Sequence, residues 1–220
     1  MMTELQAVRE RHSVRTYQDK KIESEKIQKL NALIEECNSE GNLHIQLIED
    51  AGNTFNRLLN KFMGLGSAPS VIACIGKDDD TLDERIGYFG QKIVLYAQML
   101  GLNTCWAGTY NKKNVNAEVR NGERLAIVIA VGYGVDNGRT RKSKSAEQVV
   151  RGGTQGKPEW FMNGVEAALL APTAVNQQKF EIVLNDDNTA EIIDKGGVLS
   201  KIDKGIVKYN FEVGSDQSDR

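Results

Sequence analysis

"ERLAIVIAVGYG", residues 123–134, is the stretch of sequence that decides the fold class. From Leu125 to Val131 every side chain is apolar, so the segment has no polar face to turn toward water. A second segment of this kind is "SVIACIGK", residues 70–77. Strands that are apolar on both faces are typical of a sheet interior covered by helices. The two segments therefore predict a central sheet in an α+β or α/β protein.

Helical patterns surround these strands. The longest covers residues 81–102, where one apolar stripe repeats at helical spacing and Gly101 is expected to end the helix. The stripe consists of Ile86, Phe89, Ile93, Tyr96, Ala97 and Leu100. Shorter helices are predicted at residues 3–10, 23–38 (capped by Ser24), 54–64 and 160–171.

The remaining segments are predicted from alternation and turn residues. Residues 43–50 alternate between apolar and polar side chains and predict a strand. Residues 179–195 predict a β-hairpin with its turn at Asn185–Asn188. We interpret residues 103–110 as a loop, and residues 196–214 as a short helix followed by a final strand.

Composition excludes several classes of protein. The chain has 220 residues and a formal net charge of −2, which gives no general argument for binding nucleic acid or an anionic membrane. Its apolar runs fall far short of the roughly 20 residues that span a bilayer. The N-terminus has no apolar signal region. Three cysteines without CxxC spacing and two histidines disfavour a disulfide scaffold or a metal centre. We therefore expect a cytoplasmic protein.

"RHSVR", residues 11–15, is the first polar cluster that suggests a ligand. In an extended segment Arg11, Ser13 and Arg15 point the same way. Two guanidinium groups with a hydroxyl between them suit a phosphate, because the bonds are charge-assisted. A solvated charged segment after a helix is the alternative interpretation of these residues. "RTRKSKS", residues 139–145, has the same two interpretations, either a ligand-contacting loop after a buried strand or a basic surface loop.

"GLNTCWAGTY", residues 101–110, places Trp106 among small residues, which let a backbone approach a flat ligand closely. A structural turn with a packed tryptophan is the alternative. Cys105 has no basic partner nearby in the sequence, so we interpret it as a buried thiol and not as a nucleophile.

"APTAVNQQ", residues 171–178, follows a predicted helix that Pro172 breaks. Thr173, Asn176 and Gln178 offer groups that both donate and accept hydrogen bonds without adding charge. Such groups suit the polar edge of a planar heterocycle, whereas turn capping by Thr and Asn is the alternative.

An internal similarity links this motif to an earlier segment. Residues 30–50 and residues 165–187 both run helix, polar break, strand. The first break, "NSEGN" at residues 38–42, keeps little of the second beyond an asparagine. Duplication and chance recurrence of a common unit both remain open.

Taken together, these clusters resemble the flavin-dependent nitroreductase family. "RHSVR" resembles its R-x-S-x-[RK] segment, "GLNTCWAGTY" its G-L-[GN]-T-C-W-x-G turn, and "APTAVNQQ" its A-P-[ST]-x-x-N-x-Q segment. The resemblance covers most of residues 7–185. It implies an α+β nitroreductase-like fold with a central, mostly antiparallel sheet covered by helices. It also implies a set of FMN-binding residues, namely Arg11, His12, Ser13, Arg15, Trp106, Ala107, Gly108, Arg141, Lys144, Pro172, Thr173, Asn176 and Gln178.

The order of the motifs departs from the common family pattern. The A-P-[ST]-x-x-N-x-Q segment usually follows the first long helix, whereas here it lies in the C-terminal half and ends in Gln178-Lys179-Phe180. We therefore expect two similar lobes, residues 1–150 with the phosphate grip and residues 151–220 with the flavin-facing motif, packed as one unit. One FMN would bind per chain at the interface of the lobes. A monomer is favoured, with a homodimer as the alternative.

The resemblance implies an FMN-dependent NAD(P)H oxidoreductase. A nitroaromatic or quinone-like small molecule would be reduced in a ping-pong cycle with NADH or NADPH as electron donor. No side-chain acid or base is indicated, because the flavin N5 carries the chemistry. The alternative is a flavin-binding carrier or sensor without turnover, and a related flavin chemistry such as dehalogenation or flavin destruction is also open.

Overall fold

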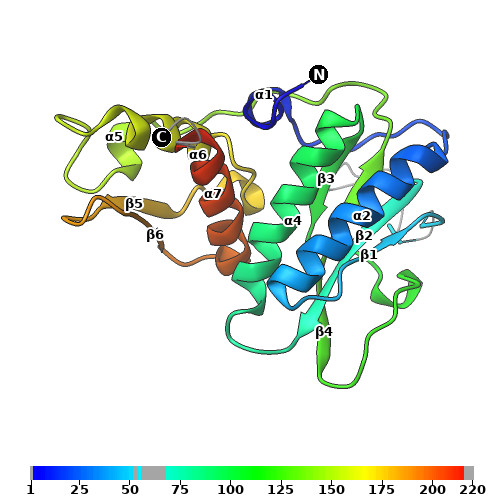
Figure 1. Cartoon of the computed structure of the whole chain (residues 1–220). Coiled ribbons are helices and arrows are strands. Elements are labelled where there is room, and N and C mark those ends of the chain that lie inside the picture. The colour runs from blue at the N-terminus through cyan, green and yellow to red at the C-terminus, as the bar shows by residue number, and fades with distance from the viewer. Residues whose placement is uncertain (1, 52–53, 56–67, 216–220) are drawn as a thin grey trace. The chain divides into compact units, whose positions relative to one another are not determined.

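The computed structural model describes residues 2–51, 54–55 and 68–215. Packing divides the chain into two compact units (Figure 1). Unit 1 comprises Arg11–Leu82 and Ile93–Thr140, and unit 2 comprises Met2–Glu10, Asp83–Lys92 and Arg141–Arg220. The predicted division at residue 150 into two similar lobes stays a prediction.

Unit 1 is built around a four-stranded antiparallel sheet with the order β1-β2-β4-β3. The strands are β1 Gln46–Ile48, β2 Ser70–Lys77, β3 Asn103–Ala107 and β4 Glu123–Gly132. The two central strands, β2 and β4, are the two stretches whose apolar runs predicted a sheet interior, and Ile72 pairs with Ile129. From Ser70 to Gly76 every residue of β2 is buried. The predicted antiparallel sheet covered by helices, and with it the α+β class, is confirmed.

Helices of unit 1 begin and end close to the predicted residues. Helix α2 spans Ser24–Gly41 and contacts β1. Its N-cap residue is Glu23, so the prediction of Ser24 as cap is wrong by one position. Helix α4 spans Leu82–Met99, of which Asp83–Lys92 belong to unit 2. Gly101 follows its C-cap with a φ of 75°, a conformation that glycine adopts without strain. A short 3-10 helix, η1, covers Lys112–Asn114. Of the predicted helix 54–64, residues 56–64 lie outside the described residues.

The interpretation of residues 103–110 as a loop is wrong for the first half of that segment. Residues 103–107 form β3, which pairs along β4 from Asn103 opposite Gly132 to Ala107 opposite Val128. The small residues of this segment give no alternating pattern. Backbone hydrogen bonds to a strand about 25 residues later decide its conformation, and periodicity in one segment cannot report them. The predicted strand 43–50 shortens to the three residues of β1.

Unit 2 is mainly helical. Its helices are α1 Glu4–Glu10, α5 Ala146–Val149, α6 Glu159–Leu169, η2 Ala174–Asn176 and α7 Ser200–Ser215. Strands β5 Phe180–Leu184 and β6 Ala190–Asp194 form the predicted hairpin, with Asn188 at a φ of 63° in its turn. Helices α6 and α7 pack against each other (Figure 1). Pro172 lies just after α6, as predicted.

The prediction of a final strand in residues 196–214 is wrong, because this segment forms the single helix α7 after a short loop. Ile202, Ile206 and Tyr209 recur at helical spacing and are buried. The alternating letters of "KYNFEV" mimic a strand. Burial of one helical face against α6 outweighs that local pattern.

Candidate functional site

The segment "RHSVR" lies along the outer edge of β3. Ser13 forms a parallel bridge with Thr104, and the backbone N–H of Val14 donates to the Thr104 carbonyl at 3.1 Å. The Val14 side chain is buried in the core of unit 1. This sheet edge therefore imposes on the segment the extended backbone that the alternating pattern required.

Arg11, Ser13 and Arg15 all lie close to the Cys105 thiol. Burial raises the pKa of Cys105, while the positive charges of Arg15 and Arg11 and a hydrogen bond with Ser13 act in the opposite direction. Arg11 is buried with 6% of its surface exposed, whereas Arg15 is exposed. Cys105 itself is a free, buried thiol. Two guanidinium groups and a hydroxyl thus gather at one edge of the sheet.

The chain after β4 holds this segment in place. The backbone N–H of Val135 donates to Thr16 at 2.9 Å. Gly138 has a φ of 77°, and a Cβ there would lie 2.8 Å from the His12 Cβ. Glycine at this position therefore lets the chain pass close to His12, which is half-buried.

Trp106, Ala107 and Gly108 lie at the end of the same edge strand. Trp106 is half-buried opposite Ile129, and Ala107 is buried opposite Val128. Gly108 follows the strand and is exposed. The arginine segment and the tryptophan segment are therefore neighbours on β3, although about 90 residues separate them in sequence.

In unit 2, the segment "APTAVNQQ" forms a tight turn after α6. Val175, Asn176 and Gln178 have φ values of 45°, 55° and 45°, all in the left-handed region. Pro172 is buried, and the Thr173 Oγ1 accepts a hydrogen bond from the backbone N–H of Gln178 at 3.1 Å. The turn closes on itself and exposes Val175 and Asn176.

Gln178 connects this turn to the basic segment, residues 141–145. Its side chain is buried with 3% exposed. Its Oε1 accepts from the Lys144 backbone N–H at 2.9 Å and from Ser143 Oγ at 3.2 Å. Its Nε2 donates to the Lys142 carbonyl and to Asn176 Oδ1, each at 3.1 Å. Every hydrogen-bonding position of this amide is occupied within unit 2.

The two predicted phosphate cations of the basic segment also hold the turn. Arg141 Nη2 donates to the carbonyls of Ala171 and, at 3.4 Å, of Leu169 at the end of α6. Lys144 Nζ donates to the Gln178 carbonyl at 2.6 Å. Burial lowers the pKa of Arg141, an effect that the charge of Asp203 opposes. Two motifs that the sequence marked separately are thus one hydrogen-bonded assembly.

Asp203, on α7, belongs to this assembly and is absent from the residues predicted from the sequence. It is buried with 8% exposed. It accepts from the Ala174 backbone N–H and, at 2.7 Å, from Gln177 Nε2. Burial raises its pKa to about 6. No local pattern singles out an aspartate in the first turn of a helix that is misassigned in part, so only the folded chain identifies it.

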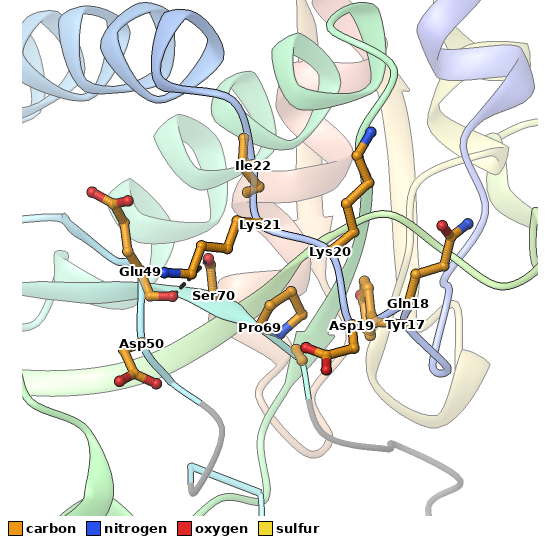
Figure 2. Close-up of a pocket in the computed structure, with 11 residues that line it drawn as sticks. Tyr17, Gln18, Asp19, Lys20, Lys21, Ile22, Glu49, Asp50, Pro69 and Ser70 are labelled. Carbon is orange, nitrogen blue, oxygen red and sulfur yellow. Dashed lines mark hydrogen bonds between the residues drawn. The ribbon is translucent and has the colours of Figure 1, made fainter.

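A separate cavity of about 500 Å³ lies in unit 1 between residues 17–22 and the segments 49–50 and 68–70 (Figure 2). On one side of it, Ser70 Oγ donates to the Glu49 carbonyl at 3.1 Å. Figure 2 shows Lys21 directed toward Glu49, while Lys20 points the other way and pairs with Glu23 at 3.0 Å. None of the predicted flavin-binding residues lines this cavity.

Residues 4–215 match the family described as "Putative TM nitroreductase". The chain belongs to this family. Nitroreductase family members are oxidoreductases, so the general class of the protein follows from membership. The "APTAVNQQ" motif lies in the C-terminal half of this chain. Its role as a flavin-binding segment stays a prediction.

Solved structures of nitroreductase-like proteins share the fold. The crystal structure of "a putative nitroreductase" from Thermotoga maritima is 21% identical, with a TM-score of 0.67 over 97% of this chain and 83% of that one. A "Putative NADH Oxidase" from Clostridium acetobutylicum is 23% identical, with a TM-score of 0.51 over 69% and 99% of the two chains. A "Putative NADH dehydrogenase/NAD(P)H nitroreductase" from Parabacteroides distasonis is 18% identical, with a TM-score of 0.51 over 66% and 95%.

Searching the curated proteins returned no match. Among the helices that the structure describes, none combines the length and apolar character needed to cross a membrane. Within the same residues, no group of three or more His, Cys, Asp or Glu side chains could hold a metal ion.

Proposed function

We propose that this nitroreductase family member is an FMN-dependent NAD(P)H oxidoreductase that reduces nitroaromatic or quinone-like acceptors. Family membership over residues 4–215 supports the oxidoreductase class. The observation that carries the cofactor proposal is the gathering of Arg11, Ser13 and Arg15 beside Cys105 at the β3 edge.

This group of donors fits a phosphate. A phosphate monoester carries up to two negative charges and accepts hydrogen bonds on three oxygens. The guanidinium groups of Arg11 and Arg15 can each donate two charge-assisted bonds, and Ser13 can donate one neutral bond. With Ser13 bridged to Thr104, the backbone that carries these donors is fixed by the sheet before any ligand arrives.

The turn in unit 2 would contribute in a different way. The side-chain amide of Gln178 is hydrogen-bonded to residues 142–144, and Arg141 and Lys144 donate hydrogen bonds to carbonyls of the turn. We propose that these three residues position the turn, and that Thr173 and Asn176 offer polar groups to the flavin. On unit 1, Trp106, Ala107 and Gly108 would supply a flat surface.

Bound FMN would supply hydride acceptance and donation, which no side chain of the chain can perform. The residues' own task is to bind and orient. Arg11, Ser13 and Arg15 would fix the phosphate end of the cofactor. The exchange would follow a ping-pong order, in which the oxidised nicotinamide, NAD(P)+, leaves before the oxidant binds.

Absorption spectroscopy of the purified protein mixed with FMN tests the proposal. We expect a bound-flavin spectrum that bleaches under anaerobic conditions when NADH or NADPH is added, and that recovers when 4-nitrobenzoate or a quinone follows. A bound flavin that never bleaches would replace this proposal with the non-catalytic flavin carrier or sensor. Absence of any flavin binding would overturn both.

Comparing FMN with riboflavin separates the phosphate grip from the rest of the site. Riboflavin lacks the phosphate, so it should bind wild-type protein at least tenfold more weakly, since one charge-assisted hydrogen bond contributes about 1.5–3 kcal/mol. Equal affinity for both flavins would remove Arg11, Ser13 and Arg15 from the proposed site.

A further inference from the structure

Another cavity, of about 370 Å³, lies within unit 2. The turn between β5 and β6, strand β6, and the first turns of α4 and α6 supply part of its lining, and one face of α7 supplies the rest. Cavities that bind small molecules have volumes of about 300–1,000 Å³, with mostly apolar or aromatic walls and a few polar groups. None of the predicted flavin-binding residues lines this cavity, so any ligand in it would be bound by other residues.

The apolar part of the lining centres on two aromatic side chains, Trp160 and Phe211. Phe211 is buried with 5% exposed, and Trp160 is half-buried. Their rings meet edge to face, with centroids 6.3 Å apart and planes at 88°, a geometry that stabilises aromatic pairs. Gly164, one turn beyond Trp160 on α6, makes room for the Phe211 ring, because a Cβ at that position would lie 2.7 Å from it. The packing of α6 on α7 therefore fixes the aromatic pair.

Lys204, Lys208 and Phe211 recur at spacings of four and three residues, so they share one face of α7. Lys204 is already paired, since its Nζ lies 2.8 Å from Glu84 Oε2 on α4. The two helices approach closely at Gly205, where a Cβ would lie 2.1 Å from the Glu84 carbonyl oxygen, and this approach brings the two charged side chains together. Their charges cancel, so neither is available to a ligand.

Three charged side chains of the lining remain, namely Glu191, Glu212 and Lys208. In the part of the chain that the structure describes, the exposed Glu191 has no hydrogen bond or ion pair. Glu212 Oε2 accepts from the Tyr88 hydroxyl at 2.5 Å, a neutral donor that leaves the carboxylate charge in place. Lys208 Nζ lies 5.6 Å from the centroid of the Tyr88 ring and has no carboxylate partner among the described residues. The cavity therefore carries two negative charges against one positive charge.

We propose that this cavity binds a small aromatic molecule that carries an ammonium group. Its ring would pack on Trp160, and its positive charge would lie near the carboxylates of Glu191 and Glu212. Excess negative charge in a cavity with apolar walls concentrates cations, and tryptophan is the side chain whose ring attracts a cation most strongly. An anion of the same shape would meet one unpaired ammonium, that of Lys208, against two carboxylates. The inference is independent of the proposed function, because it uses none of the predicted flavin-binding residues.

An NMR titration of the whole chain with two probes, in the presence of FMN, tests this inference. 2-Phenylethylamine and 3-phenylpropanoate have the same ring and the same two-carbon chain, and they differ in the sign of their charge. The chain has two tryptophans, so its proton–nitrogen spectrum contains two indole N–H signals, and Trp160→Phe shows which one belongs to Trp160. We expect the amine to shift the Trp160 signal saturably and to leave that of Trp106 in place. The propanoate should bind at least about tenfold more weakly, because it is repelled by the carboxylates and not attracted by the indole ring.

Substitution of two exposed charges tests the sign of the interaction. Glu191→Gln removes a carboxylate that has no partner in the described fold, so it should weaken amine binding about threefold, and Lys208→Gln should strengthen it by a similar factor. Glu166→Gln is the matched control, because Glu166 is an exposed carboxylate of α6 outside this lining, and it should bind the amine as wild type does.

A Trp160 signal that the amine does not shift, or equal affinity for the two probes, would overturn the proposal. Wild-type amine affinity in Glu191→Gln would overturn it as well. The proposed function is tested separately, since a protein that binds no FMN would fail that proposal and still give the expected amine titration.

Discussion

Both side-chain oxygens of Asp203 accept a hydrogen bond from one backbone N–H, that of Ala174, at 2.9 and 3.1 Å. The bond joins the first turn of α7 to the strained turn after α6, and Gln177 Nε2 adds a third contact at 2.7 Å. A buried carboxyl group thus sets the position of a segment that the sequence predicts to bind flavin.

Stability should depend on pH through Asp203. Burial raises its pKa from 3.8 to about 6, an effect reinforced by the charge of Asp194 and opposed by the bonds from Gln177 and Ala174 and the charge of Arg141. Between pH 4 and pH 6 the unfolded chain carries this group ionised while the folded chain holds it protonated. The contribution of Asp203 to the free energy of unfolding is therefore fully present below about pH 4. It falls by about 3 kcal/mol at most as the pH rises to about 6.

Denaturant unfolding of Asp203→Asn at several pH values checks this. The fall in unfolding free energy between pH 4 and pH 6 should shrink in the variant relative to wild type. Asp187→Asn is the control, because hydrogen bonds from Thr189 lower the pKa of Asp187, and its effect belongs to more acidic solutions. An unaltered pH slope in Asp203→Asn would contradict the prediction.

Replacement of Arg15 by alanine should weaken FMN binding at least tenfold. The lost charge-assisted hydrogen bond contributes about 1.5–3 kcal/mol, and riboflavin, which lacks the phosphate, should bind the variant as it binds wild type. Titration of flavin fluorescence measures both. The control is Arg120→Ala, which removes an exposed arginine that pairs with Glu118 elsewhere in unit 1. Equal loss of FMN and riboflavin affinity would argue against a phosphate contact.

Gln178→Ala should destabilise the protein without any flavin present. The change removes the side-chain partner of the Lys144 backbone N–H, while the Lys142 carbonyl keeps its bond from Asn176 Nδ2. Since an unsatisfied buried group costs about 1–3 kcal/mol, we expect a loss of this size in denaturant unfolding of the apoprotein. Thr173→Ala, which removes one bond to the Gln178 N–H, should cost less. Wild-type stability in Gln178→Ala would mean that this amide serves the ligand and not the turn.

Gly205→Ala should destabilise unit 2 through a steric clash. A Cβ at Gly205 would lie 2.1 Å from the Glu84 carbonyl oxygen and 2.6 Å from the Tyr88 backbone nitrogen. Backbone atoms cannot move aside as a side chain can. We therefore expect overpacking to lower the free energy of unfolding by about 1–3 kcal/mol or more, measured by thermal or denaturant unfolding. Gly156→Ala, where nothing lies within 4 Å, tests backbone strain without a clash and should cost less.

The favoured monomer with one FMN stays a prediction. Light scattering after size exclusion should give a mass near the 24.4 kDa of one chain, and flavin absorbance should give one FMN per chain. A mass of twice this value that persists on dilution would favour the homodimer.

The sequence by itself determined the parts whose signal lies within one segment. The apolar runs at 70–77 and 123–134 predicted the two central strands, since a strand without a polar face must be covered on both sides. Helical stripes and turn residues predicted α2, α4, α6 and the β5–β6 hairpin. The pattern of arginines, amides and glycines indicated the family, because these residue types carry their chemistry wherever the chain places them.

Only the tertiary structure decided what depends on contacts between distant segments. It made an edge strand of residues 103–107, a helix of residues 200–215, and one assembly of residues 141–145 with the turn 171–178. It also assigned Arg141 and Lys144 to carbonyls of that turn, and it revealed Asp203 and the strained Val175. The physical reason is that hydrogen bonds and packing between residues that are distant in sequence outweigh local propensity, and no single segment carries a record of its partner.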